Sequence, residues 1–332
     1  MESASYKTLT TGRGFKYNYY FSAGTPSKPT LLFVHGFPST SYDWRHQISF
    51  FQKEGFTVIA PDALGYGGTD KPEDPISYKH SGMAVDLIDV LNAEMVDKAI
   101  AIGHDWGSAL VARLASYFPE RFLAFAFLAV GYSASHVNYS YSAVTDRLAQ
   151  TLGYNPFGYW RFFTEEGAAD IIMNHWDSAL SLIYPADPML WKEHLCPPGA
   201  AKEWLLAEKV APPPSYLTEK AEVMTSKFAD EGIAGGLNWY KVFLKGIAAE
   251  DDKRGHLIIE IPETNHVVQQ PVFYGGGKSD YATLPAIAYE SLKKYCPNIT
   301  IKEFDTGHWI QLQAPDEVNR ELLVWIMAKA KL

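Results

Sequence analysis

Several features that would point to particular classes of protein are scarce in this chain of 332 residues. Cysteine occurs only twice, at Cys196 and Cys296, which is too few for a disulfide framework. The 29 Lys and Arg residues are outnumbered by 38 Asp and Glu, and the formal net charge is −9. This balance disfavours nucleic acid and anionic membrane surfaces as partners, because both need clustered positive charge.

Long hydrophobic runs and targeting signals are also scarce. The longest apolar run, from Phe122 to Val130, is far shorter than the roughly 20 residues of a membrane-spanning helix. The first residues, MESASYKTLT, have neither the basic head nor the apolar stretch of a secretory signal. The last three, Ala330-Lys331-Leu332, are close to the peroxisomal address Ser-Lys-Leu. We therefore expect no membrane span and a cytoplasmic location, with the peroxisome as the alternative.

What the sequence does contain is a rhythm of short apolar runs and helix-like stretches. Runs of this kind suit strands that are buried on both faces of a parallel sheet. They occupy residues 30–36, 56–62, 98–105 and 122–130, and the helix-like stretches between them are 42–54, 80–92 and 106–118. A further strand pair is expected at 7–11 and 16–22. The alternation predicts an α/β fold with a mostly parallel central sheet flanked by helices.

The rhythm breaks in the middle of the chain. Residues 133–250 are helical in tendency, interrupted by prolines and crowded with Tyr and Trp. Strand and helix patterns then return at 271–275, 285–294, 298–304 and 315–330. A return to strands of the first kind favours an insertion over a separate second domain. We therefore predict a discontinuous core domain, 1–132 and 251–332, with an inserted helical lid domain at 133–250.

A five-residue motif marks the first candidate for chemistry. GHDWG, residues 103–107, has the form glycine-x-nucleophile-x-glycine between a strand and a helix, where a strained turn lifts the central side chain clear. The central residue here is Asp105. Asp105 as a simple helix N-cap is the structural alternative.

Two other segments lie where a site of this kind needs its oxyanion hole and its base. HGFP, residues 35–38, follows the first buried strand, where a backbone N–H for an oxyanion hole is expected. We assign that hole to the N–H groups of Phe37 and Trp106. A candidate base, His308, follows the last strand. An acid must orient its imidazole, and we choose Asp280, after the preceding strand, over Asp305, which lies in the same turn as His308.

These motifs together make the family resemblance plain. HGFP, GYGGTDKP (65–72), GHDWGS, LNWYK (237–241) and GHWIQ (307–311) resemble those of soluble epoxide hydrolases of the α/β-hydrolase fold. The likeness extends from about residue 7 to the C-terminus. GHDWG is also found in haloalkane dehalogenases, so this motif alone does not decide the substrate.

The resemblance implies a reaction without a cofactor. Asp105 would open an epoxide through a covalent ester, and His308 with Asp280 would activate the water that hydrolyses it to a vicinal diol. Among the tyrosines of the insert, the resemblance selects Tyr159 and Tyr240 as donors of a proton to the ring oxygen. The partners expected are a small apolar epoxide and water. The residues expected to line the substrate pocket are His35, Pro38, His104, Phe157, Trp160, Trp239 and Trp309.

Two other functions remain open at this stage. A dehalogenase would use the same Asp–His–Asp set, but it commonly holds the departing halide with a side-chain N–H beside the oxyanion loop, and Phe37 offers none. A ligand receptor on a hydrolase scaffold is expected to have lost a reactive group, and none is missing. The sequence also lacks HExxH, and GGGKS (275–279) lacks the earlier glycine of a phosphate loop, since Val272 stands there, so we expect neither a metal nor a nucleotide.

Overall fold

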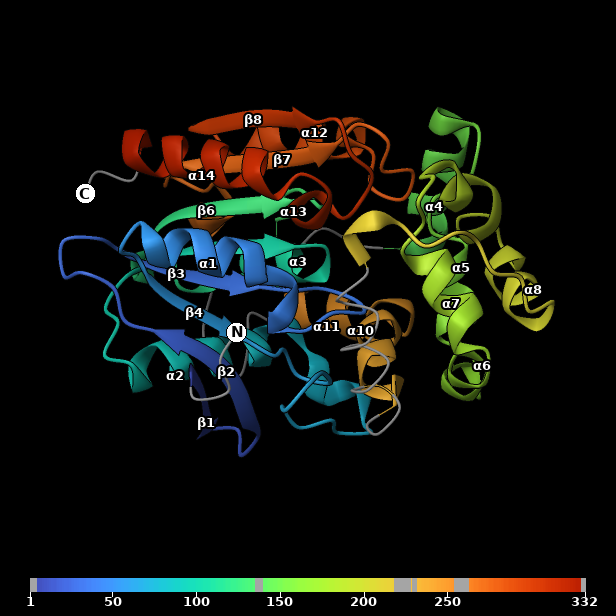
Figure 1. The fold of residues 1–332 in the computed structure, drawn as a ribbon, viewed down its shortest axis with the longest axis horizontal. Coiled ribbons are helices and arrows are strands. Elements are labelled where there is room, and N and C mark those ends of the chain that lie inside the picture. The colour runs from blue at the N-terminus through green and yellow to red at the C-terminus, as the bar shows by residue number, and fades with distance from the viewer. Residues whose placement is uncertain (1–4, 135–139, 218–227, 229–231, 254–262, 330–332) are drawn as a thin grey trace.

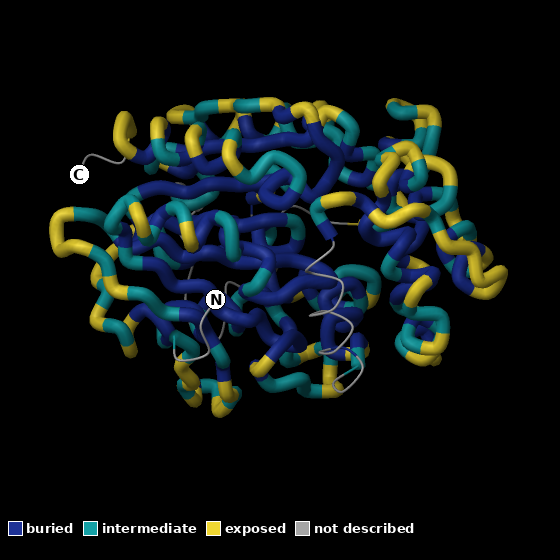
Figure 2. The backbone as a smooth tube through the Cα atoms, viewed as in Figure 1, coloured by how far each residue is buried: buried dark blue, intermediate teal, exposed yellow. Residues whose placement is uncertain are grey.

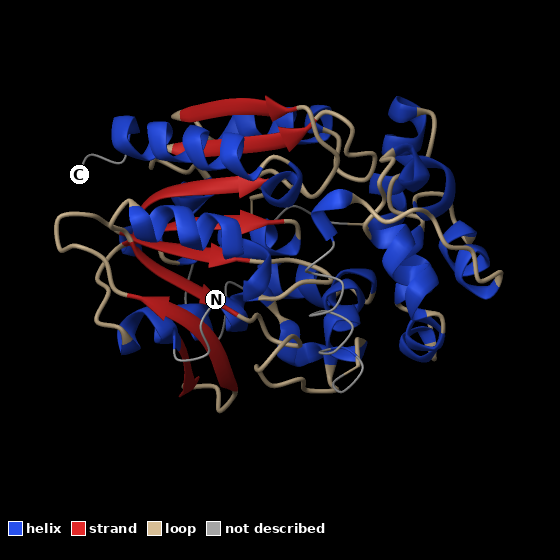
Figure 3. Ribbon diagram, viewed as in Figure 1, coloured by secondary structure: helices blue, strands red, loops and turns tan. Residues whose placement is uncertain are grey.

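The computed structural model describes residues 5–134, 140–217, 228, 232–253 and 263–329. Its centre is a sheet of eight strands in the order β1-β2-β4-β3-β5-β6-β7-β8 (Figure 3). The strands are β1 (Tyr6–Thr10), β2 (Lys16–Ser22), β3 (Thr30–Val34), β4 (Thr57–Pro61), β5 (Ala99–His104), β6 (Phe122–Leu128), β7 (Val272–Gly277) and β8 (Ile299–Phe304). Each expected strand is present, and the α/β class is confirmed.

The direction of the strands divides the sheet into a small antiparallel part and a larger parallel part. β1 pairs with β2, and β2 with β4, in antiparallel register. Every other neighbouring pair, from β4–β3 to β7–β8, is parallel. The carboxyl ends of β3 to β8 therefore meet at one edge of the sheet, which is where ligands bind in open sheets of this type.

The parallel strands are buried on both faces, as their continuous apolar runs predict. In β3, Leu31 and Phe33 belong to one hydrophobic cluster, whereas Leu32 and Val34 belong to the other. Successive side chains of a strand point to opposite faces, so the two clusters are the two sides of one sheet. Figure 2 shows this interior as a continuous buried band.

Helices cover both faces of the sheet. α1 and α14 contact each other and belong with one cluster, and α2 and α3 contact each other and belong with the other. The helices of this layer are α1 (Arg45–Lys53), α2 (His80–Ala93), α3 (Trp106–Tyr117), α12 (Pro285–Tyr295), α13 (Ile310–Gln313) and α14 (Pro315–Lys329).

A second group of helices lies beyond the carboxyl ends of the parallel strands (Figure 1). It comprises α4 (Tyr141–Leu152), α5 (Tyr159–Phe163), α6 (Ala168–Asn174), α7 (Trp176–Ile183) and α8 (Ala200–Leu206). α10 (Ala234–Leu244) contacts α5, and α11 (Ile247–Lys253) contacts α2. The helical character expected for the middle of the chain is confirmed, while its division into domains stays a prediction.

No helix among the described residues is long and apolar enough to cross a bilayer. The C-terminal tripeptide, on which the peroxisomal alternative depends, lies outside the described residues.

Candidate active site

Asp105 occupies the sharp turn between β5 and α3. Its backbone angles are φ 54° and ψ −125°, a left-handed conformation that strains a residue with a Cβ. The turn requires glycine on both sides, because a Cβ on Gly103 would lie 2.5 Å from the carbonyl oxygen of Gly107, and one on Gly107 would lie 2.1 Å from that of Val34. The side chain of Asp105 makes no capping hydrogen bond to α3, which excludes the N-cap alternative.

The carboxylate of Asp105 instead meets two groups from other loops. The backbone N–H of Phe37 donates to Oδ1 at 2.9 Å. Nε2 of His308 lies 3.5 Å from Oδ2. Gly36 allows this approach, because a Cβ there would lie 2.4 Å from Oδ1. One carboxylate oxygen is thus held by the loop after β3, and the other faces the imidazole.

Asp280 orients that imidazole from the loop after β7. Its Oδ2 lies 2.7 Å from Nδ1 of His308. Oδ1 accepts the backbone N–H groups of Ala282 and Thr283 at 3.1 and 3.0 Å, and the Thr283 hydroxyl donates to Oδ2. Asp305, the alternative acid, is exposed and lies 3.8 Å from the ammonium of Lys278. The structure therefore brings Asp105, His308 and Asp280 together in one line and leaves Asp305 outside it.

These three groups shift one another's titration. Burial by itself would lower the pKa of His308, but the carboxylates of Asp280 and Asp105 outweigh it and raise that pKa to about 10. Burial opposes ionisation of both carboxyls, yet the pKa of each lies below its usual range because His308 stabilises the charge. At neutral pH the site therefore holds an imidazolium between two carboxylates.

The expected phenols come from two different helices. Tyr159 opens α5 and Tyr240 lies in α10; they are 9% and 3% exposed, with ring centroids 6.0 Å apart. Burial raises the pKa of each phenol well above its usual value, and the negative charge of Asp105 adds to the rise in both. Both phenols are therefore neutral and able to donate a proton across a wide pH range.

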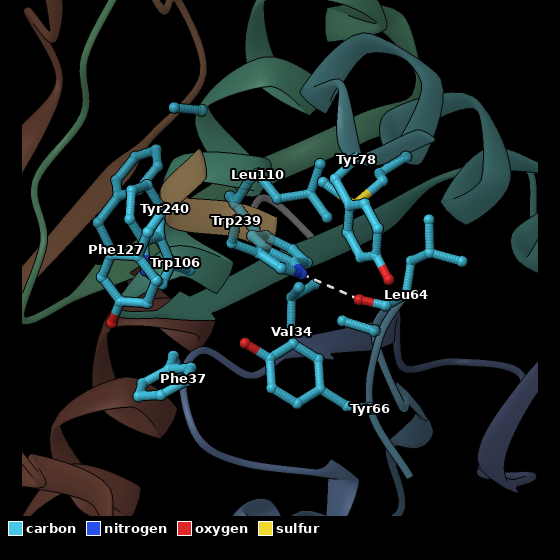
Figure 4. Close-up of a cluster of buried hydrophobic side chains, with 14 of the residues drawn as sticks. Val34, Phe37, Leu64, Tyr66, Tyr78, Trp106, Leu110, Phe127, Trp239 and Tyr240 are labelled. Atoms are coloured by element: carbon cyan, nitrogen blue, oxygen red, sulfur yellow. Dashed lines mark hydrogen bonds between the residues drawn. The ribbon is translucent and has the colours of Figure 1, made fainter. Parts of the chain in front are cut away.

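The position of α10 is fixed by the loop that follows β4. The indole N–H of Trp239 donates to the carbonyl oxygen of Leu64 at 2.9 Å (Figure 4). Gly65 and Gly235 touch backbone to backbone, since a Cβ on Gly235 would lie 2.8 Å from the carbonyl oxygen of Gly65. This contact places Tyr240 against Trp106 and Phe37, with ring centroids 5.1 Å away in each case.

Two cavities of very different size meet at Asp105 and Tyr159. The larger has a volume of about 240 Å³ and extends past Trp106, Phe157 and Trp160. The smaller has a volume of about 20 Å³ and lies between His308 and Tyr240. A volume of this order accommodates roughly one water molecule. The carboxylate of Asp105 therefore lines two cavities of different size.

The residues expected in the pocket wall divide into two groups. Phe157 and Trp160 line the larger cavity, and Trp309 lines the smaller. The other four, His35, Pro38, His104 and Trp239, line neither of these two cavities. All four are buried and each makes a hydrogen bond within the protein, so their place in the pocket wall stays a prediction.

The partners of these four residues are specific. Nε2 of His35 accepts the N–H of Ala63 at 2.9 Å, and the carbonyl oxygen of Pro38 accepts the hydroxyl of Tyr184. Nε2–H of His104 donates to the carbonyl oxygen of His308 at 2.9 Å. Burial and the positive charge of His308 lower the pKa of His104 to about 4, so this histidine is neutral at neutral pH.

Several residues of the site escaped the sequence analysis. The smaller cavity is walled by Phe163 and Ile183, and by Trp191 and Leu195, which lie in a single π-helical turn. Apolar residues in helices carry no signal that separates a cavity wall from an ordinary core. Thr283 could have been found, because Asp followed by Thr three residues later is typical of a turn in which the carboxylate accepts local N–H and O–H groups.

The described residues contain no group of three or more His, Cys, Asp or Glu arranged to hold a metal ion. The expectation that the reaction needs no metal stays a prediction.

Comparison with known proteins places this geometry in context. A family model described as alpha/beta hydrolase fold matches residues 29–315. Epoxide hydrolase 2 of Siraitia grosvenorii is 32% identical over 250 residues, covering 73% of this chain and 74% of that protein. Epoxide hydrolase A of Mycobacterium tuberculosis is 28% identical over 316 residues, covering 92% of each.

Solved structures give a similar result. An epoxide hydrolase from an endophytic Streptomyces superposes with a TM-score of 0.80 at 28% identity, covering 97% of this chain and 95% of that one. Epoxide hydrolase A from Mycobacterium thermoresistibile superposes with a TM-score of 0.78 at 27% identity, covering 98% of each chain.

Proposed function

Because the chain belongs to the alpha/beta hydrolase fold family, and its relatives described above are named epoxide hydrolases, we propose that it converts an epoxide and water into a vicinal diol. The observation that carries this proposal is the pair of buried phenols facing a carboxylate that is itself backed by an imidazole. A strained ring with an oxygen leaving group needs both a nucleophile and an acid, and this site supplies both.

In the first step Asp105 acts as the nucleophile. Its Oδ2 forms a bond to a ring carbon while the bond from that carbon to the ring oxygen breaks, and the electron pair stays on the oxygen. Tyr159 or Tyr240 donates its phenol proton to that oxygen. Oδ1 stays in its hydrogen bond to Phe37 and becomes the carbonyl oxygen of the new ester. A general acid of this kind contributes about 10²- to 10⁴-fold to the rate.

Ester formation changes the charge around His308. The negative charge of Asp105 disappears, so one of the two groups that raise the pKa of His308 is lost. The imidazolium of His308 can then transfer its proton to the phenolate formed in the first step. This transfer leaves a neutral imidazole held by Asp280 and a phenol ready for the next cycle.

In the second step water attacks the carbonyl carbon of the ester. His308 takes a proton from the water, and the oxyanion that develops on Oδ1 is stabilised by the N–H of Phe37. We assign the second donor to Trp106, whose N–H stands in the first turn of α3, where helices leave N–H groups without an intrahelical acceptor. One such donor is worth about 3 kcal/mol in the transition state.

The intermediate then collapses to diol and enzyme. The bond between the alkyl oxygen and the carbonyl carbon breaks, and His308 returns its proton to the departing alkoxide. Asp105 is left as a carboxylic acid, whose proton passes to His308. The resting pair of imidazolium and carboxylate is restored, and the net reaction consumes one water.

A dehalogenase with the same three residues fits less well. A departing halide needs N–H donors, and the two indoles of the smaller cavity already donate elsewhere: Trp191 to the carbonyl oxygen of Leu182 at 2.8 Å, and Trp309 to that of Ile183 at 3.0 Å. The indoles of Trp106 and Trp160 line the larger cavity and are the donors that a halide would have to use. The phenols of Tyr159 and Tyr240 favour an oxygen leaving group, because an alkoxide needs a proton and a halide does not.

A single turnover in ¹⁸O water separates the three functions. Excess enzyme is mixed with styrene oxide or with 1-bromobutane, and diol, bromide and the mass of the Asp105 peptide are measured. An epoxide hydrolase gives diol from styrene oxide and one ¹⁸O in the Asp105 carboxylate. Bromide release without diol would identify a dehalogenase, and binding without either product would identify a receptor.

A further inference from the structure

The carboxylate of Asp280 carries a hydrogen bond that the orientation of His308 does not require. Oδ1 accepts the backbone N–H groups of Ala282 and Thr283 at 3.1 and 3.0 Å. Oδ2 accepts Nδ1–H of His308 at 2.7 Å and also the hydroxyl of Thr283 at 2.5 Å. The two backbone bonds already fix the carboxylate in its turn, whereas the hydroxyl of Thr283 shares one oxygen atom with the base.

This shared oxygen atom lies in a buried environment. Asp280 is 0% exposed and His308 6%. Among the described residues, His308 and Thr283 are the side chains that donate to Asp280. A hydrogen bond donated to a carboxylate stabilises its charged form and makes it less basic, and burial strengthens the effect because solvent does not screen the charge. The hydroxyl of Thr283 therefore weakens the attraction of Asp280 for the imidazolium proton of His308.

The titration of the neighbouring groups agrees with this geometry. Burial opposes ionisation of Asp280, yet the charge of His308 and the hydrogen bonds from His308 and Thr283 hold the pKa of this carboxyl below its usual range. Burial raises the pKa of the thiol and the phenols around Asp280 and lowers that of His104 to about 4, so these groups stay neutral between pH 6 and 9. The titratable groups that face the pair are Asp105 and His104 beside His308, and Cys196, Tyr154, Tyr159 and Tyr274 around Asp280.

The hydroxyl of Thr283 can be removed without reshaping the site. Thr283 is half-buried and lines the larger cavity. Valine has nearly the same shape, with a methyl group in place of the hydroxyl, so the cavity keeps its volume. The backbone N–H of residue 283 still donates to Oδ1 of Asp280. Thr283→Val therefore isolates the bond to Oδ2.

Building on the proposed function, we infer that Thr283 is a positioning residue for the second step, whose hydroxyl limits how strongly Asp280 holds the proton of His308. His308 must be neutral to take a proton from water. Without the hydroxyl, Asp280 attracts the imidazolium more strongly, and His308 stays protonated, and inactive as a base, to higher pH. Ring opening by Asp105 and a phenol does not depend on this bond.

The test is the pH dependence of ester hydrolysis in Thr283→Val. Rapid-quench kinetics with styrene oxide give the rates of ester formation and ester decay between pH 6 and 9. We expect decay near neutral pH to fall about tenfold, since a hydrogen bond to a charged group is worth roughly that factor or more, and to recover as the pH rises. Thr283→Ser keeps the hydroxyl and should keep the parent's profile. A rate that is lowered equally at every pH, or that serine does not restore, would overturn the inference.

The pKa of His308 gives a readout that does not depend on turnover. Its imidazole NMR signals in the resting protein should show a higher pKa in Thr283→Val and the parent's value in Thr283→Ser. Thr306→Val is the matched control on the loop of His308, at a buried threonine whose hydroxyl has no hydrogen-bond partner among the described residues, and should change neither pKa nor decay. If Thr283→Val fails to fold, as judged by circular dichroism, Thr283→Ala removes the same hydroxyl. An unchanged pKa of His308 refutes this inference alone, whereas a parent that makes no diol from styrene oxide refutes the proposed function.

Discussion

The two halves of the candidate site are built by different parts of the fold. Asp105, Asp280 and His308 stand on turns at the carboxyl ends of β5, β7 and β8, whereas Tyr159 and Tyr240 stand on α5 and α10. The first half is held by hydrogen bonds of defined length, such as 2.7 Å between Asp280 and His308. The second half is held by ring contacts at centroid distances of 5 to 6 Å.

This difference follows from what each half has to do. A nucleophile and a base must keep their lone pairs aimed at particular atoms, which turns on parallel strands of one sheet achieve because the sheet fixes their spacing. A phenol donor must stay protonated at neutral pH and needs only an approximate position, and aromatic burial supplies both. The nucleophile and the base, which need a precise orientation, therefore lie on turns of the sheet, and the phenols that donate protons lie on the helices.

The largest effect is expected from Asp105→Asn, which removes the nucleophile from the half of the site that the sheet carries. An amide is a poor nucleophile toward an epoxide, so we expect kcat to fall by at least about 10⁴-fold, in line with loss of a nucleophile elsewhere. Turnover is measured by diol formation, and the protein is checked by mass spectrometry for unreverted amide. Asp305→Asn, at an exposed acid in the same turn as His308, is the control and should be unaffected. An Asp105→Asn protein that works at the parent's rate would refute the covalent mechanism.

His308→Gln divides the two chemical steps. Ring opening needs only Asp105 and a phenol, whereas ester hydrolysis needs the base, so we expect the alkyl-enzyme to accumulate while steady-state turnover falls about 10²- to 10⁴-fold. The measurement is intact mass after mixing with styrene oxide, which should show one added substrate. His194→Gln serves as the control at a partly exposed histidine. Absence of the adduct together with slow turnover would mean that His308 acts before the ester forms.

The helical half is tested by removing its hydroxyl groups. Tyr159→Phe and Tyr240→Phe should each slow ring opening by roughly tenfold, because one phenol remains, and the double variant by about 10² or more. Hydrolysis of an ester already formed should be unchanged, which rapid-quench kinetics measures directly. Tyr154→Phe is the matched control, since its hydroxyl donates to the carbonyl of Tyr281 and it lines neither cavity. A double variant that opens the ring at the parent's rate would remove the phenols from the mechanism.

The titration of His308 links the two steps. Its pKa of about 10 depends on two carboxylates, so Asp105→Asn should lower it, as ester formation is expected to do. Imidazole NMR signals followed from pH 6 to 11 give both values. An unchanged pKa would mean that Asp280 alone holds the proton.

The same pKa carries a consequence for stability. Since the folded value lies above the ordinary value of about 6.5, protonation of His308 stabilises the fold fully below about pH 6.5, and this contribution is lost as the pH rises toward 10. The free energy of unfolding of the parent should therefore fall more than that of His308→Gln between pH 6.5 and 10. Parallel curves for the two proteins would contradict the assignment.

The smallest expected effect concerns the anchor of α10. Trp239→Phe removes the hydrogen bond to Leu64 and leaves a buried carbonyl unpaired, which costs about 1–3 kcal/mol of stability. Trp325→Phe is the control on the other face of the sheet, because its indole N–H has no hydrogen-bond partner among the described residues. Urea unfolding should show a larger loss for Trp239→Phe, with kcat reduced only a few-fold. Equal losses would show that volume, not the hydrogen bond, holds α10.

The sequence could predict the sheet half of the site almost completely. GHDWG encodes its turn, because only glycine permits the approach of the Val34 carbonyl to position 107. Asp280 and His308 follow their strands directly, and turns after parallel strands meet at one edge of a sheet. Local sequence therefore determined both the turns and their place in the fold.

The helical half was accessible only through family resemblance, and the pocket wall was predicted only in part, through Phe157, Trp160 and Trp309. Trp239, expected in the wall, is buried with its indole N–H on the carbonyl oxygen of Leu64 and lines neither of the two cavities, whereas Phe163 and Leu195, not singled out, line the smaller one. A helix carries no local signal for which of its apolar faces meets a core and which meets a ligand.

The amino-acid sequence by itself thus determined the parallel sheet, its turns and the reactive groups on those turns. Strand burial and glycine-dependent turns depend on residues that are close together in the sequence. What only the tertiary structure decided is the space around Asp105, which lines one cavity of about 240 Å³ and another of about 20 Å³. This space arises from side chains of distant helices packing together, and no short stretch of sequence contains it.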